Sequence, residues 1–287
     1  MMCRAGNGVN ICFNHMEWRN DALCIYFAHM KNDQSGDRPR DPRHVYANPI
    51  IPEICPVLAL GVYLICFPIE KENLFLFPGN SQYDRYRKVL GRICENEAKA
   101  ELESRGIKSK DIGTHSVRKG ASSFCSSGST ACPPSVAVNL RAGWAMGGVQ
   151  DRYFRYEAAG DQYVGRTVSG LPLMQPQFAI LPPCFKELTD LVDEVLIECF
   201  PNLPSSMKLV GEFCLASIIY DQSFIAQNFH EIHSLYFSSL FRNAARFSQM
   251  QDMVECRMPT INDQITATGI PPHVKSRTKV TDVQSSK

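Results

Sequence analysis

A short stretch in the middle of the chain holds residues whose types and spacing could act on a phosphate ester. His115 and Arg118 are three positions apart, which on a helix places them on one face, about 5–6 Å from each other. Trp144 follows Arg118 by 26 residues, and Tyr153 follows Trp144 by nine. A guanidinium group matches a phosphate with two parallel hydrogen bonds, and a tyrosine hydroxyl can serve as a nucleophile. Taken singly, each residue also has an ordinary interpretation as a surface pair, a packed indole or a half-buried ring, and the neighbouring Tyr156 is a second candidate tyrosine.

Two further residues upstream extend this pattern. Arg4 precedes Lys31 by 27 residues, and Lys31 follows an apolar and aromatic run, Asp21–His29, that predicts a β-strand. Together with the four residues above, they form a set of six that matches the signature of one family in order, residue type and spacing. The set consists of Arg4, Lys31, His115, Arg118, Trp144 and Tyr153. The chain resembles the tyrosine recombinase (phage-integrase) family over about residues 1–160. The short segments around the matched residues are similar to those of eukaryotic mobile-element recombinases of the Crypton kind.

The resemblance implies a metal-free attack on a phosphodiester. Arg4 and Arg118 would clamp the non-bridging oxygens of the phosphate, a task that a planar guanidinium performs better than an ammonium group. Lys31 would act as the general acid that protonates the departing 5′-oxygen. His115 would hydrogen-bond the phosphate or help to accept the proton of the nucleophile.

The nucleophile implied by the resemblance is Tyr153. Its phenol would form a 3′-phosphotyrosyl bond, which conserves the bond energy, so no cofactor and no metal are predicted. Trp144 would donate its indole N–H to a phosphate oxygen or pack the site. Tyr153 is preferred to Tyr156 because its offset of nine residues from Trp144 matches the family.

The expected function is therefore DNA strand cleavage and rejoining, as in the site-specific recombination or integration of a transposable element. The expected partners are double-stranded DNA and further copies of the chain, as a homo-oligomer (tetramer) on DNA, in the nucleus. A catalytically inactive or truncated recombinase-derived DNA-binding or interaction protein is the alternative. A type IB topoisomerase, which shares the tyrosine chemistry, is a third interpretation.

Basic side chains outside this set are candidates for contact with the DNA backbone. One group follows Lys31 and comprises Arg38, Arg40 and Arg43. The other comprises Arg85, Arg87, Lys88 and Arg92, within a predicted amphipathic helix over Ser81–Arg105. Such residues could bind phosphates, or they could form an ordinary solvated helix face.

Composition places the chain among globular proteins. The chain has 287 residues, of which 44% are hydrophobic and 21% charged, with a formal net charge of +1. These values exclude a wholly disordered, collagen-like or coiled-coil chain. The longest apolar stretch, Val57–Phe67, is shorter than the ~20 residues of a membrane-spanning helix, so no membrane partner is predicted. The twelve cysteines include no CxxC pair and are expected to be reduced residues of an intracellular protein.

The fold class expected is mixed α/β, mostly helical, a tyrosine-recombinase-like catalytic domain with a small antiparallel sheet. That domain should cover residues 1–165, without the N-terminal core-binding domain that the family carries. A linker is predicted over 166–183, because Gly170, Pro172, Pro176, Pro182 and Pro183 punctuate it. A helical C-terminal region should follow over 184–256, and a disordered tail over 257–287.

Further helices are predicted from apolar periodicity and breaker residues. The first begins at Pro52 or Pro56 and runs through Ile65. The others lie at about 115–125, 135–141 and 149–157, and in the C-terminal region at 186–200, 206–229 and 231–256. A second short strand is predicted over His44–Ala47. The helices should gather the six family residues around one basic cleft.

Overall fold

The three-stranded sheet at the centre of the molecule is built from segments of the first 45 residues. The computed structural model describes residues 1–27, 41–144, 146–148, 156–259 and 268–274. Strands β1 (Met16–Arg19), β2 (Ala22–Ile25) and β3 (Arg43–Val45) pair antiparallel in the order β1-β2-β3, with Met16 opposite Ile25 and Cys24 opposite His44. A two-residue turn joins β1 to β2, and Asn20 adopts a positive φ there, as asparagine readily does in such turns.

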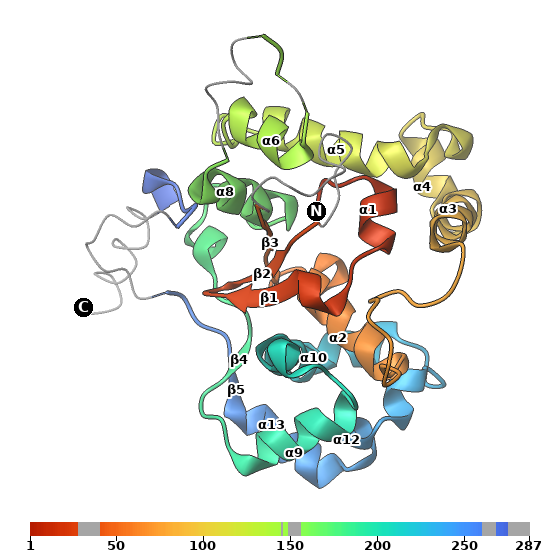
Figure 1. Ribbon diagram of the computed structural model, residues 1–287, viewed down its shortest axis with the longest axis vertical. Coiled ribbons are helices and arrows are strands. Elements are labelled where there is room, and N and C mark those ends of the chain that lie inside the picture. The colour runs from red at the N-terminus through yellow and green to blue at the C-terminus, as the bar shows by residue number, and fades with distance from the viewer. Residues whose placement is uncertain (28–40, 145, 149–155, 260–267, 275–287) are drawn as a thin grey trace.

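Most of the remaining described chain is helical, and Figure 1 shows how these elements surround the sheet. The longer helices are α2 (Pro56–Cys66), α3 (Gln82–Arg92), α5 (Thr114–Ser127), α6 (Ser135–Ala142), α8 (Ala158–Val168), α9 (Asp190–Cys199), α10 (Lys208–Tyr220) and α13 (Ala244–Met253). Shorter ones are α1 (Ala5–Val9), α4 (Lys99–Ser104), α11 (Gln222–Asn228) and α12 (Ser239–Arg242), and strands β4 (Cys184–Phe185) and β5 (Val254–Glu255) form a second, two-stranded sheet. The prediction of a mostly helical protein with a small antiparallel sheet is therefore confirmed.

Helices cover the central sheet on two sides. In Figure 1, α5, α6 and α8 lie above it, and α2 and α10 lie below it with α9, α12 and α13 beyond them. α8 packs on β3 at very close range, because a Cβ atom added to Gly165 would lie 2.4 Å from the His44 carbonyl oxygen. Only glycine permits that approach.

The C-terminal helices share one hydrophobic core with the N-terminal sheet. The indole of Trp18 on β1 stacks on Phe213 of α10 with ring centroids 3.9 Å apart. α10 also crosses α2 at Gly61, where an added Cβ would lie 2.9 Å from the Cys214 carbonyl oxygen. The predicted helical region over 184–256 is therefore packed into the first part of the chain.

The predicted linker over 166–183 is packed, not extended. Its first three residues complete α8, and the side chains of Arg166 and Phe178 are only 1% and 0% exposed. Leu171, Phe178 and Ala179 form a small core with Tyr46 and with Val274 from the predicted tail. The glycines and prolines here shape turns around buried side chains, which composition alone cannot distinguish from a flexible linker.

Several helices predicted as continuous are divided in the structure, among them 206–229, which is α10 and α11 with Asp221 between them. The helix predicted over 81–105 is α3, a π-helical turn (Ile93–Glu97) and α4, which ends at Gly106 with φ +71° as its sequence suggests. The segment 231–256 is divided into a 3-10 turn (Ser234–Phe237), α12 and α13. Most of the helix predicted over 149–157 lies outside the described residues.

Candidate functional site

Arg118 lies on the inner face of α5, and His115 lies one turn before it. Arg118, Ser122 and Cys125 are the buried residues of this helix, at the i, i+4, i+7 spacing of one face. His115 is exposed at the first turn. The predicted helix is confirmed, and it presents the arginine from within the fold and the imidazole at its surface.

The C-terminus of α6 holds the guanidinium of Arg118. Arg118 Nη2 donates a hydrogen bond to the Ala142 carbonyl oxygen, and its guanidinium carbon lies 5.3 Å from the centre of the Trp144 ring. Gly143 ends the helix in the left-handed region at φ +63°, with its N–H bonded to the Leu140 carbonyl. The Gly-Trp pair thus has a structural cause, because the glycine turns the chain so that the indole meets the arginine.

Arg4 belongs to the same place. It precedes α1, and the side chain of Met2 is buried in the small core formed by Cys125, Val138 and Val164 of α5, α6 and α8. That anchor holds the first residues of the chain against α5. The pKa of Arg118 is lowered first by burial and then by the positive charge of Arg4.

Electrostatically, the two guanidinium groups form a cationic site. Within the described residues, neither Arg4 nor Arg118 forms an ion pair with a carboxylate. The Nε atom of Arg118 is buried and has no hydrogen-bond partner there, while Trp144 remains 41% exposed. The structure therefore brings Arg4, Arg118 and Trp144 together, with His115 one helical turn away.

The basic residues of α3 are exposed, as a DNA-contacting face requires. Arg85, Arg87, Lys88 and Arg92 all lie at the surface. Among the carboxylates that the structure describes, one pairs with this group, with Arg87 Nη2 3.7 Å from Asp84 Oδ1. α3 approaches α5 through Tyr83, whose hydroxyl lies 3.4 Å from Thr114 Oγ1 at the start of α5. These four residues stay candidates for contact with DNA phosphates.

Arg43 is a correction to the predicted DNA contacts. Its side chain is buried, with Nη2 3.4 Å from the Leu140 carbonyl oxygen and Nη1 4.0 Å from Asp161 Oδ1. The guanidinium is committed to the C-terminus of α6 and to a buried carboxylate, so it cannot track a DNA backbone. Lys31, Arg38, Arg40 and Tyr153 lie outside the described residues.

The carboxylate of Asp161 forms a buried ionic cluster that the sequence analysis missed. It accepts hydrogen bonds from Arg141 Nη1 at 2.6 Å and from the His44 backbone N–H at 2.9 Å, and its Oδ2 atom also lies 2.9 Å from His44 Nδ1. Arg141 Nη2 donates to the His44 carbonyl at 2.8 Å. Against the opposing effect of burial, the charge of Arg141 and these hydrogen bonds lower the pKa of Asp161 to about 2. A sequence signal existed, because Arg141 is a charge on the apolar face of a predicted helix, two residues before the Gly-Trp pair.

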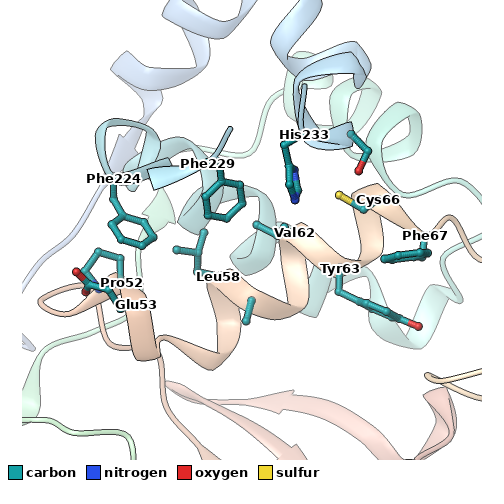
Figure 2. Close-up of a pocket in the computed structure, with 12 residues that line it drawn as sticks. Pro52, Glu53, Leu58, Val62, Tyr63, Cys66, Phe67, Phe224, Phe229 and His233 are labelled. Atoms are coloured by element: carbon teal, nitrogen blue, oxygen red, sulfur yellow. The ribbon is translucent and has the colours of Figure 1, made fainter. Parts of the chain in front are cut away.

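A pocket of about 430 Å³ lies elsewhere, between α2 and residues 224–234. Figure 2 shows Leu58 and Val62 on one wall, and Phe224, Phe229 and His233 pointing into the pocket from the other. The lining is largely aromatic and aliphatic, and no residue of α5 or α6 contributes to it. The pocket is therefore separate from the arginine site.

No three His, Cys, Asp or Glu side chains of the described chain converge as a metal site would need. No single described helix is long and apolar enough to cross a membrane, although α10 and its preceding turn, taken with α11 across a 64° bend, reach that length and composition.

Comparison with known proteins finds no matching family model, no matching curated protein and no matching solved structure.

Proposed function

We propose that the chain binds a DNA phosphate at Arg4, Arg118 and Trp144 and cleaves and rejoins the strand through Tyr153, as a recombinase or integrase of the tyrosine type. One observation carries the proposal. The guanidinium of Arg118 lies 5.3 Å from the centre of the half-exposed Trp144 ring, the charge of Arg4 is near enough to lower its pKa, and no described carboxylate pairs with either arginine. Like charges gathered in this way repel one another, and a bound anion turns the repulsion into attraction.

The surroundings of Arg118 suit a phosphate with two accessible oxygens. A guanidinium has five N–H donors, and the Ala142 carbonyl and the Trp144 ring engage only one donor and one face of the group. Fixing the side chain in advance means that little orientational freedom is lost when the anion binds. The exposed His115 and the exposed basic residues of α3 would extend the cationic surface along a duplex.

The proposed reaction balances without a metal. The phenol oxygen of Tyr153 attacks phosphorus, the 5′-oxygen leaves with a proton supplied by Lys31, and the phosphate remains on the enzyme as a 3′-phosphotyrosyl ester. Arg4 and Arg118 stabilise the extra negative charge of the pentavalent transition state, and His115 handles the proton of the phenol. Rejoining reverses these steps with another 5′-hydroxyl. The enzyme would act as a tetramer on double-stranded DNA in the nucleus.

A DNA-binding protein without cleavage activity is the second candidate. The observation that favours it is the burial of Arg118, which is only 9% exposed and donates to a backbone carbonyl. In that case the arginine would position α6 and the cationic surface would bind DNA without chemistry. The two functions differ in whether a covalent adduct forms.

The test is a nicked suicide substrate taken from the ends of the parent element, with the covalent protein–DNA adduct followed on a denaturing gel. Wild-type protein should form the adduct, and Tyr153→Phe should form none while its Kd for DNA changes by less than about twofold. Arg118→Lys keeps the charge but loses the planar fork, and it should lower the rate of adduct formation by roughly 10²-fold or more. Arg105→Lys, in an exposed pair with Glu101, is the matched control and should leave the rate unchanged. Tight DNA binding with no adduct from the wild type would instead support the second candidate.

A further inference from the structure

Tyr156 ties together two parts of the chain that are distant in sequence. It is the first described residue after 149–155, and its hydroxyl donates a hydrogen bond of 2.9 Å to the Pro42 carbonyl oxygen, 114 positions earlier. Pro42 directly precedes β3 and follows the segment that includes Lys31. The phenol therefore joins the chain just after Tyr153 to the chain just before β3.

The Asp161 cluster makes a second tie between the same stretches. Asp161, five residues after Tyr156, binds His44 of β3 through both its backbone N–H and its ring nitrogen. Arg141 binds both Asp161 and the His44 carbonyl from the end of α6. The chain that leaves α6 at 142 and returns at 156 thus has both of its ends fixed to β3.

The environment of Tyr156 suits a hydrogen-bond donor and not a nucleophile. Its ring is partly buried, and its pKa is raised by burial first and by the negative charge of Asp161 second. A phenol that stays protonated and is already bonded to a carbonyl is poorly placed to attack a phosphate. The second tyrosine of the sequence pattern thus has a different use.

We propose that Tyr156 is a positioning residue for the cleavage reaction: its hydrogen bond to Pro42, together with the Asp161 cluster, fixes the chain three residues after the nucleophile to the residues at the start of β3. The inference rests on the proposed function. Tyr153 is three residues from Tyr156, so chain geometry keeps their Cα atoms within roughly 11 Å of each other. A misplacement of about 1 Å can slow a reaction 10²-fold, so a tie this close to the nucleophile bears directly on rate.

The experiment compares Tyr156→Phe with Tyr63→Phe. Each variant removes one hydroxyl that donates at 2.9 Å to a backbone carbonyl, from Tyr156 to Pro42 or from Tyr63 to Leu76, and keeps the ring. Single-turnover adduct formation at saturating DNA should slow between about 10- and 100-fold in Tyr156→Phe, with Kd unchanged, and should stay at the wild-type rate in Tyr63→Phe. Equal rates in the two variants would overturn the proposal, as would an adduct that survives Tyr153→Phe but is lost in Tyr156→Phe.

A readout that needs no activity separates this inference from the proposed function. Amide hydrogen exchange in peptides covering 41–48 and 156–161 should speed up several-fold in Tyr156→Phe and stay unchanged in Tyr63→Phe. A wild-type protein that forms no adduct would refute the cleavage function and the positioning role with it, even where exchange still shows the tie. Unchanged amide exchange in Tyr156→Phe would refute the stabilising role of the hydrogen bond from Tyr156 to Pro42, whether or not the wild type cleaves DNA.

Discussion

Replacing Asp161 with asparagine removes the one negative charge at the centre of the buried cluster. Asp161 and Arg141 have side chains only 2% and 1% exposed and lie 2.6 Å apart. The Asp161→Asn variant keeps the size of the side chain and part of its hydrogen bonding, but leaves the guanidinium groups of Arg141 and Arg43 buried beside a neutral amide. Removing one partner of a buried ion pair strongly destabilises the fold, because the remaining charge has lost both water and its partner.

The expected loss of stability is about 3–5 kcal/mol. The lowered pKa of Asp161, about 2 against 3.8, corresponds to roughly 2 kcal/mol for the carboxylate alone, and the stranded arginines add to it. For a chain of this size, each kcal/mol shifts Tm by about 2–4 °C, so a fall of roughly 10 °C is expected. Thermal unfolding followed by circular dichroism at pH 7 measures it.

The control is Glu101→Gln, which breaks an ion pair of nearly the same length at the surface. Glu101 and Arg105 lie 2.8 Å apart with both side chains 68% exposed, and such pairs contribute about 0–1 kcal/mol. Burial is thus the main difference between the two tests. A Tm for Asp161→Asn within 2 °C of that for Glu101→Gln would refute the reasoning.

The stability of the protein at acidic pH depends on the same carboxylate. Because the pKa of folded Asp161 lies below its unfolded value, the stabilisation is complete above about pH 4 and is lost as pH falls towards 2. The wild type should therefore lose stability more steeply than Asp161→Asn between pH 4 and pH 2. Parallel curves over that range would contradict the assignment.

Two other changes test the packing and a second buried acid. Gly165→Ala should lower Tm by several degrees, because its Cβ would meet the His44 carbonyl oxygen at 2.4 Å. Gly120→Ala in α5, where nothing lies within 4 Å, should instead raise the free energy of unfolding by about 0.5–1 kcal/mol. Similar Tm values for the two variants would refute the close approach of α8 to β3. Burial and then the charge of Glu53 raise the pKa of Asp221 to about 7, so ionisation of this carboxyl opposes folding as pH rises from 4 to 7. Asp221→Asn should therefore stabilise the protein above pH 7 and have little effect near pH 4. Urea unfolding at the two pH values measures the difference, and an equal effect at both would contradict it.

Local sequence patterns predicted the elements that carry the arginine site. The breaker residues and apolar spacing around α2, α5 and α6 are short-range signals. The structure has α5 and α6 within one or two residues of the predicted ends, and α2 begins at Pro56, the second of its two predicted starts. Gly143 marks the end of α6 because a left-handed residue there is nearly always glycine. The same signals failed over 81–105, 206–229 and 231–256, where the predicted helical pattern continues through breaks that the structure has at Ala98, Asp221 and Asn243.

The sequence by itself determined the order and chemical types of Arg4, His115, Arg118 and Trp144, and hence the kind of chemistry to look for. Only the tertiary structure decided which cations are available to a ligand. Arg43 and Arg85 look alike in sequence, yet Arg85 is exposed, whereas Arg43 is buried because residues about a hundred positions away, Leu140 and Asp161, surround it. Burial is a property of contacts between distant segments, and composition along the chain does not record those contacts. For the same reason the segment 166–183, whose glycines and prolines predict a linker, contributes Leu171, Phe178 and Ala179 to a packed core.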